Sequence, residues 1–556
     1  MVEIRLSLAL TFSRELGRIV LKPLHLLLSG LLLAASQPTL AAELPRLVAK
    51  DGRHALLVDG KPFLILGAQA NNSSNYPDML PRVWPMLDRI HANTLEMPVA
   101  WQQVEPTEGQ FDFSFVDELL KQARANDKKL VLLWFGTWKN TAPSYVPDWV
   151  KLDNKRFPRA KKPDGSDHYL HSPHARATLE ADKKAFVALM QHLKAVDAQN
   201  TVILVQPQNE VGSYNNPRDF SPEAEKLFRQ PIPPALAKAT GKSGTWAQAF
   251  GKGADRAFNS WYMARFIDEM AAAGKAVKPI PMFVNAALHS PFGEPEPSSV
   301  SSGGPQWDVL DIWKAAAPNI DFAAPDIYSR EEKTVSAWLD GYTRADNALF
   351  VPEIGNAADY ARFFWAVLGR GGIGFAPFGM DSTDFYNYPL GAKRLDDETL
   401  HAFADKFALF SRIGRDWAKI AYVHPTWGVA RPDDGSSRAT QMGDWKIEAS
   451  FEQWQFGHKD WAWMKRDPVP WAGKPVGGAA VAQIAPNQFL VAGDHVRLTF
   501  SAGANVTNGL MLKVEEGGFT DGKWVTSRVW NGDQVDYGLT FNEKPALLRV
   551  TMGSYK

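Results

Sequence analysis

Short apolar runs alternate with amphipathic stretches through most of the chain. The runs that could form buried strands are residues 63–68, 94–99, 130–135, 202–206, 281–284, 322–324, 349–351 and 374–378. Between them, apolar residues recur at spacings of three and four. This spacing predicts helices over residues 80–91, 115–126, 179–195, 257–273, 334–345 and 360–368.

Strands that alternate with helices indicate a parallel sheet of the α/β class. Eight such units over roughly 370 residues fit a (β/α)8 TIM barrel better than an open doubly wound sheet of five or six strands. The main insertion into this pattern covers residues 214–253. A hairpin is expected before the first barrel strand, around the turn signal Asp59-Gly60.

After about residue 413 the pattern changes to strand-like runs separated by turns. Examples are residues 445–454, 495–500, 509–514, 523–530 and 546–552, with tight turns at Asp521-Gly522 and Asn531-Gly532. We therefore expect a barrel over residues 43–413 and an all-β, sandwich-like domain over residues 414–556.

The N-terminal segment has the order of a secretory signal. An apolar stretch at residues 24–35 follows Arg14, Arg18 and Lys22, and small residues lead up to Ala41 and Ala42. About 12 apolar residues are too few to cross a bilayer, so we interpret residues 1–42 as a signal peptide. An uncleaved anchor is the alternative. After cleavage we expect no integral membrane span and a periplasmic or secreted protein.

Composition excludes several classes of function. The chain has 61 basic and 61 acidic residues, so it has no positive excess with which to bind nucleic acid. It has no Cys, which excludes disulfides, thiolate metal sites and a Cys nucleophile. It has 20 Trp, whose flat rings pack well on the C–H faces of sugars, although most are expected in the core.

Two carboxylates directly follow predicted strands. Glu210 follows the fourth strand and Glu353 follows the seventh. In a TIM barrel the active site lies at the carboxyl ends of the strands, so the two should face one site. Two facing carboxyls can cleave a glycosidic bond: one protonates the leaving oxygen, and the other attacks the anomeric carbon or activates water.

Two further motifs accompany this pair. Asn209 precedes Glu210, and residues 101–113 read W-x-x-x-E-P-x-x-G-x-F-D-F. With these motifs the chain resembles clan-A glycoside hydrolases, in particular the β-galactosidase families 35 and 42. The resemblance implies that Glu210 is the acid/base, that Glu353 is the nucleophile and that Asn209 binds the sugar 2-hydroxyl. It also implies that Tyr328 donates a hydrogen bond to the nucleophile.

Other residues near the predicted strand ends are candidates for sugar subsites. They are Glu96 and Trp101 after the second strand, Trp134 and Trp138 after the third, and Asn285 after the fifth. For each Trp, packing in the core is the alternative. The eighth strand ends in Phe378-Gly379-Met380-Asp381, without the Trp that many clan members carry there.

The function expected from these features is that of a retaining exo-β-glycosidase, a β-galactosidase acting on terminal residues of oligosaccharides. The alternatives are a clan-A endo-glycanase of the mannanase or xylanase type and a non-catalytic carbohydrate-binding protein. We expect no cofactor and no metal, because His168, His171 and His174 lack the spacing of a helical metal site. The oligomeric state is left open.

Overall fold

The computed structural model describes residues 43–296, 300–452 and 468–556. Eight parallel strands form its central sheet, in the order β10-β11-β12-β13-β4-β5-β6-β9. A parallel bridge between Val205 and Met282 joins the two outer strands and closes the barrel. Each predicted run is one of these strands: β4 (Ile65–Gln69), β5 (Thr94–Ala100), β6 (Lys129–Lys139), β9 (Val202–Asn209), β10 (Phe283–Ala287), β11 (Phe322–Ile327), β12 (Phe350–Ile354) and β13 (Gly374–Pro377). The TIM-barrel prediction is confirmed.

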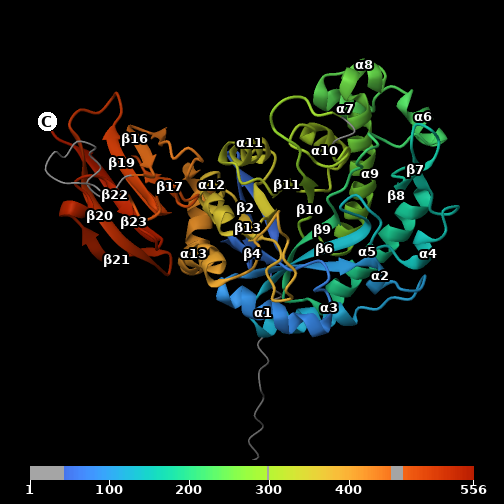
Figure 1. Ribbon diagram of the computed structural model, residues 1–556, viewed down its shortest axis with the longest axis horizontal. Coiled ribbons are helices and arrows are strands. Elements are labelled where there is room, and N and C mark those ends of the chain that lie inside the picture. Colours follow the sequence, from blue (N-terminus) through green and yellow to red (C-terminus); the bar gives the residue numbers. More distant parts are fainter. Residues whose placement is uncertain (1–42, 297–299, 453–467) are drawn as a thin grey trace, which may run out of the picture. The chain divides into compact units, whose positions relative to one another are not determined.

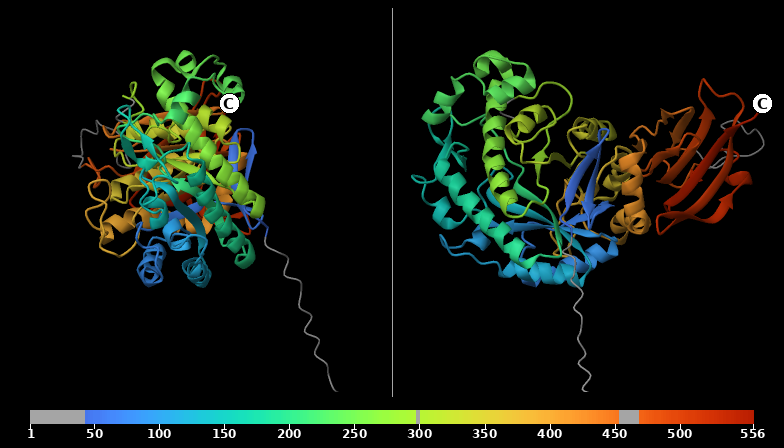
Figure 2. Two further views of the ribbon diagram at one scale, coloured as in Figure 1. Left: turned by 90° about the vertical axis from the view of Figure 1, so that its right-hand side faces the viewer. Right: turned by 180° about the vertical axis from the view of Figure 1, so that it is seen from behind.

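Helices lie outside this sheet, where Figures 1 and 2 show them. They are α1 (Leu80–Arg89), α3 (Ser114–Ala125), α5 (Arg176–Val196), α9 (Ala254–Val277), α10 (Leu310–Ala316), α11 (Glu332–Tyr342), α12 (Phe363–Gly369) and α13 (Asp397–Val423). Each longer amphipathic helix buries its apolar stripe; α3, for example, buries Val116, Leu119, Leu120 and Ala123. The six predicted helices are all present. The last of them is split between η3 (Ala358–Arg362) and α12.

The amino-terminal end of the barrel is filled with apolar side chains. The strands β1 (Arg46–Lys50), β2 (Arg53–Val58) and β3 (Lys61–Phe63) form an antiparallel sheet, which includes the predicted hairpin at Asp59-Gly60. Leu56 and Val58 pack with inward-facing Phe283, Phe322 and Phe350 in one buried cluster. Because this end is packed and apolar, the polar residues that enter the barrel gather at its other end.

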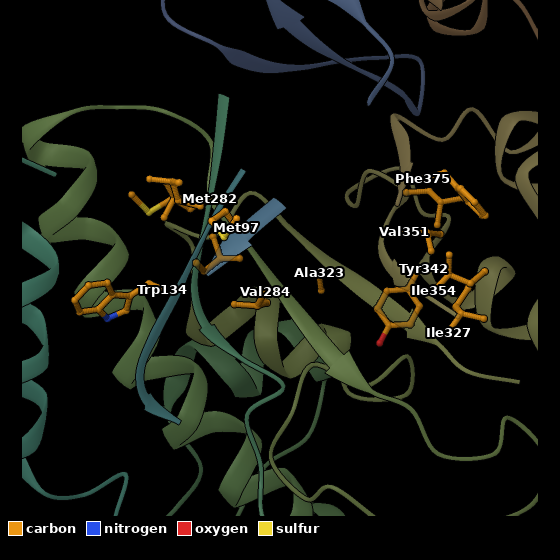
Figure 3. Packing of buried hydrophobic residues seen from close by; sticks show 14 of the residues in the cluster. Met97, Trp134, Met282, Val284, Ala323, Ile327, Tyr342, Val351, Ile354 and Phe375 are labelled. Carbon is orange, nitrogen blue, oxygen red and sulfur yellow. The ribbon is translucent and has the colours of Figure 1, made fainter. Parts of the chain in front are cut away.

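A second cluster lies between the strands and the helices. Figure 3 shows part of it, including Met97, Trp134, Met282 and Val284. Successive side chains of a strand point to opposite faces, so Leu130, Leu132 and Trp134 of β6 join this outer cluster while Val131, Leu133 and Phe135 face inward.

The insertion at residues 214–253 contains α6 (Pro222–Phe228), α7 (Pro234–Thr240), α8 (Trp246–Phe250) and η2 (Gly251–Gly253). Buried Arg218 holds its start: its guanidinium lies 4.0 Å from the ring centroids of Phe220 and Phe228. It also pairs with Glu225 at 2.6 Å and with Asp255 at 2.7 Å. Further segments that the sequence did not predict are η1 (Pro77–Met79), α2 (Trp101–Val104), α4 (Asp148–Lys151) and the hairpin β7 (Arg159–Lys161) and β8 (Asp167–His171).

The C-terminal region forms two antiparallel sheets, which confirms the predicted all-β domain. Their orders are β14-β17-β18-β23-β20-β21 and β15-β16-β19-β22. The strands are β14 (Thr426–Ala430), β15 (Arg438–Met442), β16 (Trp445–Ser450), β17 (Gly478–Ala485), β18 (Gln488–Asp494), β19 (Val496–Ala502), β20 (Gly509–Thr520), β21 (Lys523–Trp530), β22 (Leu539–Phe541) and β23 (Ala546–Ser554), with η4 (Gly532–Gln534) between β21 and β22. Helix α13 continues past residue 413 to Val423, so the strands begin at Thr426.

Polar contacts join this domain to the barrel. The buried carboxylate of Asp494 accepts a hydrogen bond from Trp365 Nε1 at 2.8 Å and one from Lys406 Nζ at 2.6 Å. Pairing with Lys406 and hydrogen bonding keep the pKa of Asp494 below its ordinary value, although burial alone would raise it.

The predicted signal peptide, residues 1–42, lies outside the described residues. Within the described part of the chain, we find no helix that combines the length and the apolar character needed to cross a membrane.

Candidate active site

A cavity of about 810 Å³ opens at the carboxyl end of the barrel strands. Both carboxylates that the sequence singled out, Glu210 and Glu353, line it. Lys139, Asp326 and Tyr328 also contribute to its wall. The strand ends therefore bring together residues that are far apart in the sequence.

Glu210 follows directly on β9, where the backbone is strained. Gln208 and Glu210 have φ angles of 68° and 44°, in the left-handed region that residues other than Gly seldom adopt. Such strain persists only where surrounding contacts impose it. Here the Glu210 N–H donates to Asn285 Oδ1 at 2.9 Å, and Gln208 Nε2 donates to buried Asp182 at 2.6 Å. These bonds fix the backbone that carries the Glu210 carboxyl.

Glu353 lies in β12 and is held by two side-chain donors. Gln69 Nε2, at the end of β4, donates to Oε2 at 3.0 Å. The Tyr328 hydroxyl, which follows β11, donates to Oε1 at 2.5 Å. Only 5% of Glu353 is exposed, so its orientation is fixed by these two bonds within a buried setting. The contact expected between Tyr328 and this carboxyl is present.

Asp326 is a third carboxyl in the site. One carboxyl oxygen each of Glu210, Asp326 and Glu353 lies within 4.8 Å of the other two. Asp326 pairs in register with Glu353 across β11 and β12, and it accepts a hydrogen bond from Asn285 Nδ2 at 2.6 Å. Asn285 thus bridges Asp326 to the Glu210 backbone. It is a positioning residue in this structure.

Burial and the crowding of carboxyls favour the protonated forms of Glu210 and Asp326. Burial, and next the charge of Glu353, raise the pKa of Glu210 to about 7. Lys139 and a hydrogen bond with Asp326 act in the opposite direction. Burial, and next the charges of Glu353 and Glu210, raise the pKa of Asp326 well above its ordinary value. The three oxygens are close enough to ligate a cation, but the raised pKa values of Glu210 and Asp326 oppose its binding, because a carboxyl must lose its proton to ligate a metal.

Asn209 and Glu96 are buried and are not among the residues that line the cavity. Asn209 ends β9, and both polar atoms of its buried amide are without a hydrogen-bond partner in the described structure. Glu96 of β5 is fully buried and likewise has both carboxyl oxygens unpaired there. Burial, followed by the charge of Glu353, raises the pKa of Glu96 well above its ordinary value. Glu96 was expected at a sugar subsite, but in the structure it is a buried residue that does not line the cavity.

The three tryptophans expected at subsites lie in the core, which corrects that expectation. Trp101, Trp134 and Trp138 are fully buried and are absent from the cavity wall. Trp134 and Trp138 lie within β6, on the face that points outward to the helices. Their indole N–H groups donate to Asp182 Oδ1 and to the His171 carbonyl, and that of Trp101 donates to Glu105. For Trp134 and Trp138, the pleat of β6 decides this placement, whereas Trp101 begins α2.

Asp326, Lys139 and Gln69 are site residues that sequence reasoning missed. Each lies at or next to the carboxyl end of a barrel strand, the same signal that drew attention to Glu210 and Glu353. Asp326 stands two residues before Tyr328 in the sequence. Applying the strand-end rule to every polar residue would have included all three.

Comparison with known families and structures covers parts of the chain. Residues 81–272, which include Glu210, match the family model described as Beta-galactosidase (glycoside hydrolase family 42). Residues 403–542 match a domain of unknown function, DUF5597. Among curated proteins, none matches the chain.

Two β-galactosidase crystal structures are among the solved structures with some likeness. That of Bacillus circulans sp. alkalophilus has 14% identity and a TM-score of 0.46, covering 64% of this chain and 57% of that one. That of Rahnella sp. R3 has 15% identity and a TM-score of 0.46, covering 67% and 59%. The chain thus spans less than two thirds of either protein. Residues 81–272, within the barrel, are thus similar to the β-galactosidases of glycoside hydrolase family 42.

Proposed function

We propose that the protein is a retaining exo-β-glycosidase with the specificity of a β-galactosidase. The observation that carries the proposal is the pair Glu210 and Glu353, whose nearest carboxyl oxygens lie within 4.8 Å at one cavity. Retaining enzymes hold their carboxyls about 5–5.5 Å apart, whereas inverting enzymes separate them by about 6.5–9.5 Å to admit a water. Nearest oxygens within 4.8 Å of each other leave little room for a water between the two carboxyls, which supports retention. The family match supports galactose as the sugar.

In the first step, a Glu353 oxygen attacks the anomeric carbon and the glycosidic C–O bond breaks. Glu210 donates its proton to the departing oxygen. A pKa of about 7 lets Glu210 hold this proton near neutral pH. Tyr328 and Gln69 keep the Glu353 carboxylate aligned for the attack. Asn209 directly precedes Glu210 and its amide has no hydrogen-bond partner in the described structure, which supports a role for it in binding the sugar 2-hydroxyl.

In the second step, water displaces Glu353 from the anomeric carbon. Glu353 is then an ester without charge, so one of the causes that raise the pKa of Glu210 is gone. The pKa of Glu210 falls, and its carboxylate accepts a proton from the attacking water. The C–O bond to water forms as the ester bond to Glu353 breaks. The same carboxyl therefore serves as acid and then as base.

Exo action is proposed from the residues that bound the cavity. Tyr214, at the start of the insertion, lines it on one side, and Phe385 and Leu390, after β13, line it as well. Loops that bound a pocket suit removal of terminal residues, whereas an endo-glycanase needs an open trench. To test exo action, the products of a β-galactosyl oligosaccharide digest are followed by chromatography. Exo action should release sugars from the chain end.

The main experiment measures nitrophenol release from aryl α- and β-glycosides. We expect turnover of the β-galactoside, with the β-anomer of galactose as the first product by NMR. Glu353→Ala should abolish it, and azide should rescue Glu210→Ala by forming the β-galactosyl azide. Initial formation of the α-anomer would refute retention. Preference for another β-glycoside would refute galactose as the sugar. Binding of sugars without any turnover, in aryl glycosides and polysaccharides alike, would favour a carbohydrate-binding protein.

Export to the periplasm or medium belongs to the same proposal, because residues 1–42 have the order of a signal peptide. Mass spectrometry of the protein isolated from cells should find an N-terminus near residue 43. An intact N-terminus would refute cleavage.

A further inference from the structure

The segment after β13 exposes large apolar side chains at the edge of the cavity. Phe385 is 60% exposed, Tyr386 40%, Tyr388 58% and Leu390 47%. Phe385 and Leu390 line the cavity together with Asn387, whereas Tyr386 and Tyr388 do not. A cluster of exposed apolar residues beside a cavity marks a surface that binds a partner or ligand.

Hydrogen bonds fix this segment at both ends. Before it, Asp381 accepts bonds from Asn71 N at 2.8 Å and from Ser74 Oγ at 2.7 Å. After it, the Leu390 carbonyl accepts from the Tyr360 hydroxyl at 2.8 Å, and Arg330 donates to the Pro389 carbonyl at 3.0 Å. The exposed rings therefore stand on an anchored support, as a preorganised binding surface requires.

The place of these side chains decides which part of a substrate they meet. Glu210, Asp326 and Glu353 are each at most 8% exposed, so the scissile bond and the terminal sugar lie at the buried end of the cavity. In an exo-enzyme the next sugar lies toward solvent. Phe385, at 60% exposure, is on that outer side of the same cavity.

We propose that residues 385–390 form the subsite for the leaving-group sugar, with the Phe385 ring packing on its C–H face and the Asn387 side-chain amide contacting its hydroxyls. An aromatic ring presents an apolar face that matches the axial C–H groups of a pyranose. The eighth strand lacks a Trp, and Phe385 supplies an aromatic ring seven residues after Phe378. This inference rests on the proposed function and adds to it the class of leaving group: a glycosyl residue.

The test compares two substrates that share the terminal sugar. β-Galactosyl fluoride has no sugar in the leaving-group position, whereas a β-galactosyl disaccharide has one. The measured quantity is kcat/KM for the disaccharide divided by kcat/KM for the fluoride. In Phe385→Ala this ratio should fall about tenfold relative to wild type, which corresponds to the loss of one aromatic contact. Phe385→Trp keeps a ring and should keep the ratio.

Tyr386→Ala is the matched control, because Tyr386 is an exposed aromatic residue of the same segment that does not line the cavity. It should leave the ratio at the wild-type value. An unchanged ratio in Phe385→Ala, with wild type cleaving both substrates, overturns the inference alone. An equal fall in Tyr386→Ala also overturns it, because the effect would then come from the loop. Wild type that cleaves neither substrate overturns the proposed function and this inference with it.

Discussion

Replacing Glu210 by Gln should stabilise the protein at high pH but not at low pH. Burial and Glu353 raise the pKa of Glu210 from its ordinary 4.5 to about 7 in the folded state. In the unfolded chain the carboxyl ionises near 4.5. Below pH 4.5 the Glu210 carboxyl is protonated in both the folded and the unfolded state, so it does not change the free energy of unfolding. Between 4.5 and 7 only the unfolded state loses its proton, so stability falls as pH rises, and above 7 the deficit is constant.

The loss of unfolding free energy follows from the difference between the two pKa values of Glu210, in the folded and the unfolded state. At about 1.4 kcal/mol for each pH unit, it reaches about 3 kcal/mol above pH 7. The amide that replaces the carboxyl cannot ionise, so the variant avoids this cost. At an unfolding entropy of about 2 cal/mol/K per residue, its melting temperature at pH 8 should exceed that of wild type by about 3 °C.

The assay is thermal unfolding by calorimetry at pH 4, 6 and 8. Wild type is compared with Glu210→Gln and with Glu543→Gln, which removes the same charge from an exposed position. The difference in melting temperature between Glu210→Gln and wild type should be near zero at pH 4 and largest at pH 8. Glu543→Gln should show no such trend. A constant difference across these pH values would refute the reasoning.

The other predictions concern activity and the core. Glu353→Ala should lower kcat on the order of 10⁴-fold or more, and a modest loss by aryl-glycoside assay would exclude Glu353 as nucleophile. Tyr328→Phe removes the donor to Glu353 and should lower kcat/KM about 10- to 100-fold with an unchanged melting temperature; equal activity would show that the bond is dispensable. Because burial and the neighbouring carboxylates favour the protonated form of Asp326, Asp326→Asn should keep activity within about threefold. Asp326→Ala loses the hydrogen bond to Glu210 that lowers the pKa of that residue, so it should move the basic limb of the pH profile upward. A collapse of activity in Asp326→Asn would mean that a charge is needed at this position. Asp182→Ala leaves four buried donors unpaired and should cost about 3 kcal/mol or more by denaturant unfolding; a neutral result would contradict the assigned network.

The hydrophobic pattern determined most of the architecture, because the periods of strands and helices are local properties of the chain. All eight barrel strands and six helices followed from apolar spacing, and the change of period near the C-terminus indicated an all-β domain. The strand-end rule also found Glu210 and Glu353, since a parallel barrel brings every carboxyl strand end to one site.

Tertiary structure decided what lies on each face. The pleat of β6 turns Trp134 and Trp138 toward the helices, so they are core residues rather than sugar platforms. The register of β11 against β12 sets Asp326 beside Glu353, and burial there raises the pKa values of Asp326 and Glu210. A single sequence determines where strands end. How closely carboxyls from different strands approach, and how little water reaches them, depends on long-range packing that no local pattern encodes.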